Sequence, residues 1–235
     1  KIPKAGALSL ILKGAVETCA GRWSQALRTL DQAQALDPEN AWTALWKFRA
    51  RCESNFMSGR SFKMQEALKE LDRAIVLDPR NPHAYAWRAR SLKAMSFVAK
   101  ALEDIDRTIL LSPDYIWAKA IRGNLRAELG LVREALADCD EIFTRCPGKA
   151  WVWAQRARVR ARCSQEKSML EECVFDLDQA IKVEPGNSMY YAWRGEVHRL
   201  LGGKVQAEAD FLRSAGLKPR YAITLLWMAK VRILE

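Results

Sequence analysis

Several kinds of chemistry find no support in this 235-residue sequence. It holds two histidines, His83 and His198, and neither belongs to an H-x3-H or H-E-x-x-H pattern, so no zinc site is indicated. Neither of the two common glycine-rich phosphate loops, G-x-G-x-x-G and G-x4-G-K-[ST], occurs. Nothing marks a Cys–His nucleophile pair, such as a strained elbow or a Gly-rich oxyanion turn. The sequence therefore predicts a protein that is not an enzyme and that holds no metal and no cofactor.

Long apolar runs are missing as well. The sequence has no stretch of 18 apolar residues and no charged segment followed by an apolar leader with a cleavage site. Neither a membrane span nor a signal peptide is therefore expected, and no membrane partner. The first residue is Lys1 rather than Met, as expected for a fragment of a longer protein.

Disulfide chemistry is not indicated either. The six cysteines form no C-x-x-C pair and fall within predicted helical stripes or at a turn, at Cys19, Cys52, Cys139, Cys146, Cys163 and Cys173. Disulfide frameworks belong to small secreted domains that lack a sufficient core. We expect small, mostly buried thiols and an intracellular, cytoplasmic location.

What the sequence does have is an excess of positive charge. Lys and Arg number 38 against 28 Asp and Glu, which gives a formal net charge of +10. Such a balance bears on partners and not on fold. It favours acidic peptides, phosphate groups or nucleic acid as ligands, or it reflects only a well-solvated basic surface.

The dominant feature is an internal repeat, clearest in the 34-residue stretch 82–115. Each copy closes with a proline, a residue that cannot continue a helix. These prolines are Pro38, Pro79, Pro113, Pro147, Pro185 and Pro219. Their spacing of 34 residues, lengthened in two copies, predicts a helical pair in each copy.

Two further landmarks recur in phase with the prolines. The first predicted helix of each copy carries a basic residue followed by Gly or Ala, at Lys13-Gly14, Arg49-Ala50, Arg88-Ala89, Arg122-Gly123, Arg156-Ala157 and Arg194-Gly195. The second helix opens with a small residue, at Ala26, Ala67, Ala101, Ala135, Cys173 and Ala207. Small side chains let neighbouring helices approach closely, so these positions mark helix crossings.

These residues resemble the tetratricopeptide repeat, a 34-residue helix–turn–helix unit with small residues at set positions and a closing proline. The resemblance implies an all-α, right-handed superhelical solenoid. We expect one domain over residues 1–235, with repeats at about 7–42, 43–81, 82–115, 116–149, 150–187 and 188–221. The apolar segment 222–235 is predicted to be a terminal helix, either the first helix of a seventh repeat or a surface for self-association or a further domain.

Two repeats are longer than the others. The extra residues fall around 52–62 and 164–169, between the two predicted helices of their repeats. An added helical turn and a loop are both compatible with these insertions. They are interpreted as tolerated insertions, with a functional edge as the alternative.

Three Asp-x-Asp motifs, at 104–106, 138–140 and 176–178, suggest a metal site at first sight. Helical residues two apart point about 200° apart, so the two carboxylates of one motif cannot share an ion. Their period matches that of the basic landmark. We therefore expect the Asp residues to pair with Arg49, Arg88, Arg122, Arg156 and Arg194.

The family resemblance also implies a ligand groove lined by the first helices. In such proteins, ligands contact the second, fifth, ninth, twelfth and thirteenth positions of the repeat. The ninth positions here are Ala15, Arg51, Arg90, Asn124, Arg158 and Glu196. The second positions of repeats three to six are His83, Trp117, Trp151 and Met189, and the fifth positions are all Ala: Ala86, Ala120, Ala154 and Ala192. Lys93 and Arg162 extend the basic line.

Periodicity sorts the Arg and Trp residues into binding and packing sets. Arg158 and Arg162 are four apart and share the predicted groove face, whereas Arg156 and Arg160 share a packing face. Most tryptophans are expected in the core, namely Trp42, Trp46, Trp87, Trp153, Trp193 and Trp227. Trp23 is predicted to lie in the core or at an edge, and Trp117 and Trp151 fit either a core or a binding role.

We therefore predict a protein–protein interaction scaffold that binds an acidic peptide segment or partner protein in a basic concave groove. The predicted contacts are Arg51, Arg90, Asn124, Arg158, Arg162 and His83, with Trp117 and Trp151 as apolar anchors. One alternative is a nucleic-acid-binding module, since Arg and Trp also form single-strand channels. Another is a regulatory or substrate-recruiting arm of a larger enzyme. A basic face without a ligand is the plainest alternative.

Overall fold

The computed structural model of the chain describes residues 5–58, 64–164 and 166–217. In these ranges every regular element is an α-helix, as predicted. The chain divides into two compact units, Lys1–Tyr115 and Ile116–Glu235, which are taken separately below. None of the described helices is long and apolar enough to cross a membrane.

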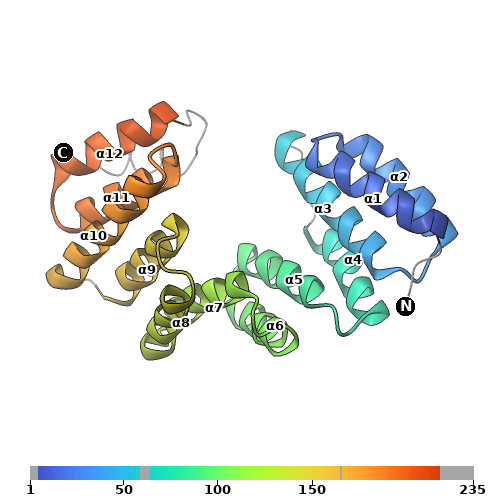
Figure 1. Cartoon of the computed structure of the whole chain (residues 1–235), viewed down its shortest axis with the longest axis horizontal. Helices are drawn as coiled ribbons and strands as arrows, with labels where there is room; N and C mark the ends of the chain where they lie inside the picture. The colour runs from blue at the N-terminus through green and yellow to red at the C-terminus, as the bar shows by residue number, and fades with distance from the viewer. Residues whose placement is uncertain (1–4, 59–63, 165, 218–235) are drawn as a thin grey trace. The chain divides into compact units, whose positions relative to one another are not determined.

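Both units consist of helices that pack in consecutive pairs (Figure 1). Unit 1 contains α1 (Ala5–Cys19), α2 (Trp23–Leu36), α3 (Ala41–Ser58), α4 (Met64–Leu77), α5 (Pro82–Ala94) and α6 (Val98–Leu111). Unit 2 contains α7 (Ile116–Glu128), α8 (Val132–Arg145), α9 (Ala150–Cys163), α10 (Lys167–Val183), α11 (Ser188–Leu200) and α12 (Lys204–Leu217). α1 begins two residues before the predicted repeat 7–42, and α3 begins two residues before the predicted repeat 43–81. The predicted helix 222–235 lies outside the described residues.

Repeats also stack on one another inside each unit. The second helix of a repeat contacts the first helix of the next, as α4 contacts α5 and α10 contacts α11. First helices also meet, as in the pairs α1 with α3, α7 with α9, and α9 with α11. Stacked repeats can therefore bury apolar side chains against one another, which no isolated helix pair could do.

The helix starts follow a signal that the sequence analysis did not use. Asn40, Asn81 and Asn187 each lie two residues after a closing proline. Their side chains accept hydrogen bonds from the backbone N–H two residues on, at 3.0, 3.0 and 3.2 Å. Asn is among the best N-cap residues because it satisfies an N–H that has no partner within the helix. The proline ends one helix, and the asparagine starts the next.

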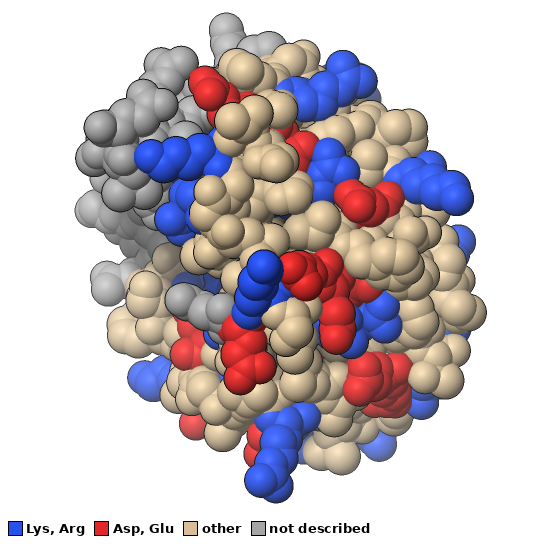
Figure 2. Space-filling view, turned by 90° about the vertical axis from the view of Figure 1, so that its left-hand side faces the viewer, with Lys and Arg blue, Asp and Glu red and all other residues tan. Residues whose placement is uncertain are grey.

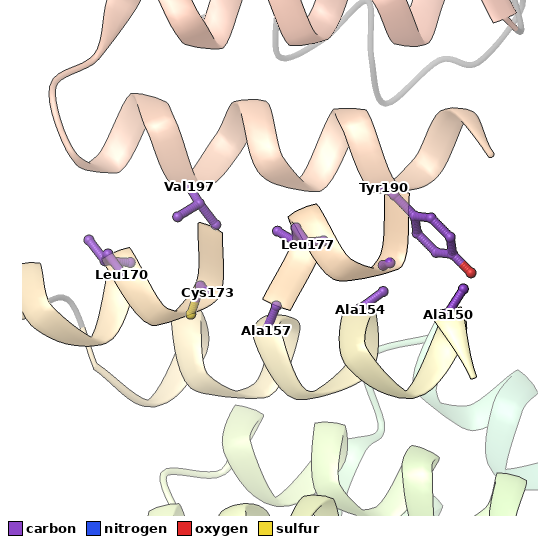
Figure 3. Packing of buried hydrophobic residues seen from close by; sticks show 9 residues of the cluster. Ala150, Ala154, Ala157, Leu170, Cys173, Leu177, Tyr190 and Val197 are labelled. Atoms are coloured by element: carbon purple, nitrogen blue, oxygen red, sulfur yellow. The ribbon is translucent and has the colours of Figure 1, made fainter. Parts of the chain in front are cut away.

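Close packing explains the small residues of the repeat. A Cβ added at Gly14 would lie 2.6 Å from Leu30 Cγ, and one at Gly195 would lie 2.5 Å from Phe211 Cε1. Figure 3 shows the corresponding layer in repeat five, where Ala157 of α9 and Cys173 of α10 lie close beneath α11. The predicted role of small residues at helix crossings is confirmed.

The two insertions lengthen helices. α3 has 18 residues and α10 has 17, whereas the first and second helices of repeat three have 13 and 14. The additional residues of repeat two extend the end of α3, and those of repeat five precede and lengthen α10. Residues 59–63 and 165 lie outside the described residues.

The turns inside four repeats place one residue in the left-handed region. Gly21, Gly130 and Gly202 take φ values of 74°, 76° and 80°, and the matching residue of repeat three is Ser96, at 65°. Glycine adopts this region without steric penalty, whereas a residue with a Cβ does not.

Replacing Ser96 by Gly should therefore raise the free energy of unfolding by roughly 0.5–1 kcal/mol, because it removes the strain at positive φ. Urea denaturation followed by circular dichroism measures the change. Gly130→Ser is the matched control and should lower stability by a similar amount, since no atom lies within 4 Å of its added Cβ. A destabilised Ser96→Gly variant would contradict the argument.

Candidate functional site

The recurring arginines bind buried aspartates inside their own repeats. Arg88 of α5 donates from Nε and Nη2 to the two carboxylate oxygens of Asp104, at 2.8 and 2.7 Å. Arg194 of α11 holds Asp210 in the same way, at 2.9 and 2.6 Å. The Asp104 hydrogen bond raises the pKa of Arg88 above its usual value. Such two-point pairing fixes the angle between the helices of a repeat.

Repeats four and five make the same contact with an additional arginine. Asp138 of α8 binds Arg122 at 2.6 Å and Arg126 at 2.8 Å. Asp176 of α10 is bound at 2.6 Å by Arg156 of α9 and at 3.3 Å by Arg160. The predicted packing role of Arg156 and Arg160 is therefore confirmed.

The carboxylate two residues further along the second helix reaches the next repeat, both in the motif 176–178 and at Asp72, which follows Glu70 in repeat two. Asp72 of α4 lies 2.8 Å from Arg88 of α5, and Asp178 of α10 lies 2.5 Å from Arg194 of α11. Each of these arginines joins a carboxylate of its own repeat to one of the preceding repeat. The two carboxylates of a motif thus face different partners, as the helical geometry predicts.

Arg156 likewise interacts with carboxylates of two repeats, Asp176 of its own repeat and Asp140 of the preceding one. Burial alone would lower its pKa, but the hydrogen bonds that it donates to Asp176 and the negative charges of Asp176 and Asp140 raise it. Its guanidinium also lies 4.0 Å from the ring centroid of Phe143 and 4.9 Å from that of Trp153. Arg156 therefore links both helices of its repeat to α8.

The prediction was wrong for Arg49. Its Nε donates to Glu53 on the same helix, at 2.9 Å. The position that holds Asp104 in repeat three holds Glu70 in repeat two, and Glu70 pairs with Arg51 at 3.0 Å. The longer Glu side chain extends to an arginine two residues further along α3.

Unit 1 contains three of the predicted site residues. Arg51 is half-buried and neutralised in part by Glu70. Arg90 of α5 is exposed. Burial raises the pKa of the Cys52 thiol to about 11, and the positive charge of Arg90 opposes this rise. The His83 ring lies 5.6 Å from the ring of Trp42 and 5.5 Å from that of Tyr115. His83 is thus one member of an aromatic row.

The core prediction was wrong for Trp42, which is 41% exposed. It lies in the first turn of α3, and its ring is tilted by 49° against that of His83 on α5. Three of the other tryptophans pack against the core as predicted, Trp87 in unit 1 and Trp153 and Trp193 in repeats five and six. Trp46 is half-buried and meets Trp87 edge to face, with ring centroids 6.1 Å apart. Trp227 lies outside the described residues.

Unit 2 brings the remaining candidates onto three adjacent first helices, α7, α9 and α11, called the α7–α9–α11 face below. Asn124 and Gln155 both donate their amide N–H to the carbonyl of Ala120, each at 2.8 Å. Trp151 is half-buried and packs against a cluster that includes Ala120 and Ile142. These contacts draw α7 and α9 together around one backbone carbonyl.

The acceptor atom of Asn124 is left without a hydrogen-bond partner. Oδ1 is buried and contacts no donor in the described part of the chain. The side-chain orientation is fixed because Nδ2 faces the Ala120 carbonyl. A buried acceptor without a donor costs about 1–3 kcal/mol, so the structure retains an unusual group at a predicted contact position.

The two arginines of the predicted groove line have partners on neighbouring first helices. Arg158 of α9 lies over the ring of Trp193 on α11, 4.7 Å from its centroid. Arg162 lies 3.2 Å from Glu128 of α7. Trp117 of α7 is exposed. The α7–α9–α11 face thus carries two oriented guanidiniums and an exposed indole.

The predicted alanine positions and Gln155 complete the description of this face. Ala86, Ala120, Ala154 and Ala192 are all buried, so the fifth position serves close packing of first helices. Gln155 was missed. The available signal was a polar residue at a helix position where Trp87 and Trp193 stand in other repeats.

Charge is mixed on the surface of the molecule. Basic and acidic side chains alternate over the coloured part of the face drawn in Figure 2. The net charge of +10 is therefore not gathered into one basic stripe on this face. No group of three or more His, Cys, Asp or Glu side chains within the described ranges is arranged to hold a metal ion. A shallow cavity of about 420 Å³ lies elsewhere, between Glu184 and Leu217.

Comparisons with known proteins show the fold. No family model and no curated protein matches the sequence. A tetratricopeptide repeat protein from Parabacteroides merdae superposes with a TM-score of 0.74 at 19% identity, over 98% of this chain and 87% of the other. PilW, a type IV pilus biogenesis factor, gives 0.75 at 13% identity, over 95% and 98%. YrrB, a tetratricopeptide repeat protein with an unusual peptide-binding site, gives 0.53 at 14% identity, over 83% and 95%.

Replacing Asp176 by Ala should lower the free energy of unfolding by about 3 kcal/mol, because it leaves Arg156 and Arg160 without their buried carboxylate. Denaturant unfolding measures the loss. Asp178→Ala is the matched control on the same helix: its side chain is 48% exposed against 1% for Asp176, so the cost should stay within about 1 kcal/mol. Equal losses for the two variants would refute the distinction.

Thiol reactivity should separate the cysteines by burial. Burial raises the pKa of Cys139 and of Cys173 to about 12, whereas Cys19 is exposed. The thiolate forms only as pH rises through the pKa, so at pH 8 the two buried thiols should react with iodoacetamide more than about a hundredfold slower than Cys19. Mass spectrometry after timed labelling gives the rates, and labelling in denaturant should abolish the difference. Native-state labelling of Cys139 as fast as Cys19 would disprove the packing described here.

Proposed function

We propose that this chain, which has the fold of tetratricopeptide repeat proteins, is a protein–protein interaction scaffold that binds an acidic peptide segment or partner protein along its first helices. Two structural neighbours support this class of function. YrrB is described as having a peptide-binding site, and Cut9, with a TM-score of 0.74 at 12% identity, forms a hetero-tetramer with Hcn1. This chain spans 42% of the Cut9 structure.

The observation that carries the proposal is the pair of oriented guanidiniums on the α7–α9–α11 face, Arg158 over Trp193 and Arg162 beside Glu128, with the exposed Trp117 on α7. Guanidinium groups bind carboxylates at two points, and an exposed indole supplies apolar contact. The Oδ1 atom of Asn124 is buried in the free chain, so the Asn124 side chain would have to turn outward for this acceptor to meet a backbone N–H of the segment.

The neighbouring arginines favour carboxylates. The Arg162–Glu128 pair is exposed on both sides, and exposed pairs of this kind contribute about 0–1 kcal/mol. An incoming carboxylate can therefore replace Glu128 at little cost. Stacking on Trp193 uses the face of the Arg158 guanidinium, and bidentate carboxylate recognition uses the N–H edge of such a group. The arrangement favours a segment that carries acidic side chains opposite Arg158 and Arg162.

Aromatic side chains supply apolar contact in both units. Trp117 is exposed on α7, and Trp151 offers the uncovered part of a half-buried ring on α9. In unit 1, the ring of His83 contacts that of Trp42, and Arg90 is exposed on the same helix as His83. Tryptophan and arginine are the residues that most often dominate binding energy at interfaces. Arg51 should contribute less than Arg90, since Glu70 already pairs with it.

A pull-down from cell extract tests the proposal, with wild-type chain beside an Arg90→Ala/Arg158→Ala double variant. We expect bound proteins that resist nuclease treatment and that fall about tenfold or more with the double variant. The matched control is Arg107→Ala/Arg133→Ala, which removes the same charge from exposed positions on the second helices α6 and α8.

Three outcomes would count against the proposal. Equal capture by the wild type and the double variant would show that these first-helix arginines do not contribute to binding. Capture lost equally in the control pair would show a net-charge effect only. Binding that disappears with nuclease and falls log-linearly with salt would replace a protein partner by nucleic acid.

A further inference from the structure

The first helix of unit 1 carries a row of exposed apolar side chains. Leu8, Leu12 and Val16 of α1 are 42%, 59% and 63% exposed. Residues four apart lie on one face of a helix, so the three form one continuous stripe. Single exposed apolar residues are ordinary on protein surfaces, but a contiguous row marks an interaction surface.

The same helix positions are covered in other repeats. Relative to the basic residue of the first helix, Leu12 corresponds to Trp193 and Val16 to Val197 in α11. Val197 is 3% exposed and packs with Leu170 of α10, the second helix of the preceding repeat. In repeat three, the residue matching Leu12 is Trp87, which packs on the cluster formed by α3 and α4. The α1 stripe is thus the repeat-stacking face.

A positive charge accompanies the stripe at the matching position. The basic residues Arg88 and Arg194 each form an ion pair with an aspartate of the preceding second helix, Asp72 at 2.8 Å and Asp178 at 2.5 Å. Lys13 occupies this position in α1 and is exposed. Within the described ranges no carboxylate pairs with it. The α1 face therefore presents both halves of the stacking interface, the apolar stripe and the cation, and no acidic helix from the described part of the chain packs against them.

We propose that the α1 face, made of Leu8, Leu12, Lys13 and Val16, binds an amphipathic helix of another protein that places a carboxylate against Lys13. The contact of α4 with α5 is the template. There, Leu68 and Ile75 of α4 pack in the same cluster as Trp87, and Asp72 reaches Arg88. The bound helix carries apolar residues at a three-to-four spacing and an Asp or Glu between them. This surface is independent of the α7–α9–α11 face.

The charge pattern argues against a second copy of this chain as the occupant. The last described second helix, α12, has Leu212 where Asp72 and Asp178 stand in earlier repeats. Head-to-tail stacking of two copies would bring this leucine to Lys13 and leave the cation unpaired. Such a contact would also be heterologous and would continue from copy to copy into a ring or an open filament. An acidic helix from another protein meets both requirements of the face.

The test uses a peptide with the sequence of residues 64–80, which contains α4 and Asp72. A short isolated helix is marginal in water, so a hydrocarbon link between positions 69 and 76 holds it helical. Both linked positions are exposed in the protein. The peptide carries a fluorophore, and anisotropy reports its binding to the full 235-residue chain.

We expect saturable binding with a defined response to two substitutions. Leu12→Glu should weaken it at least about tenfold, because it places a charge in the apolar stripe. Lys13→Glu should weaken it about fivefold, and a peptide with Asp72→Lys should restore it. Val205→Glu is the matched control: Val205 is 79% exposed on α12 and should not affect binding.

The proposal fails if no saturable binding occurs up to about 1 mM peptide, the weakest affinity of interest here. It also fails if Leu12→Glu leaves binding unchanged, since the peptide then binds elsewhere. Concentration-dependent self-association of the wild type that Leu12→Glu abolishes would show a contact between copies, and would overturn the choice of occupant. Circular dichroism keeps these outcomes interpretable: because the substituted positions are exposed, the variants should match the wild type in helix content and in denaturation midpoint.

Discussion

The pairing of arginine with buried aspartate is the interaction on which repeats three to six depend. Asp176 is fully enclosed, and a carboxylate in that environment is tolerated only because Arg156 and Arg160 supply charge and hydrogen bonds. The pair is directional, unlike the apolar contacts around it. It therefore determines the angle between the helices of a repeat, while the small residues at the crossings determine their distance.

Much of this organisation is legible in the sequence, because it repeats. The prolines, the basic landmark and the small residues share one period, and a period fixes helix pairs and their crossings without any knowledge of side-chain contacts. The Arg–Asp pairing was predictable for the same reason. Arg49 broke the rule because Glu70 replaces aspartate in repeat two, and one extra methylene moved the contact to Arg51. Period alone does not encode side-chain length.

The candidate site was less predictable than the fold. Sequence places Asn124, Arg158 and Arg162 on first helices, but it does not show which of them are already engaged. Arg158 stacks on a tryptophan of the next repeat, and the amide of Asn124 is oriented by a backbone carbonyl that it shares with Gln155. These contacts join residues from different repeats. A single helical wheel does not contain them.

The Asp-x-Asp motif has a consequence for how such a chain changes over evolutionary time. One carboxylate serves its own repeat and the other serves the following one, as Asp176 and Asp178 do. A repeat that carries one such motif and one arginine, called a cassette here, can therefore form these ion pairs with any neighbouring repeat of the same kind. Duplication or loss of a whole cassette leaves every remaining charge paired. Leu212 breaks the series, so a cassette inserted after α12 would meet a mismatched neighbour, whereas one inserted between earlier repeats would not.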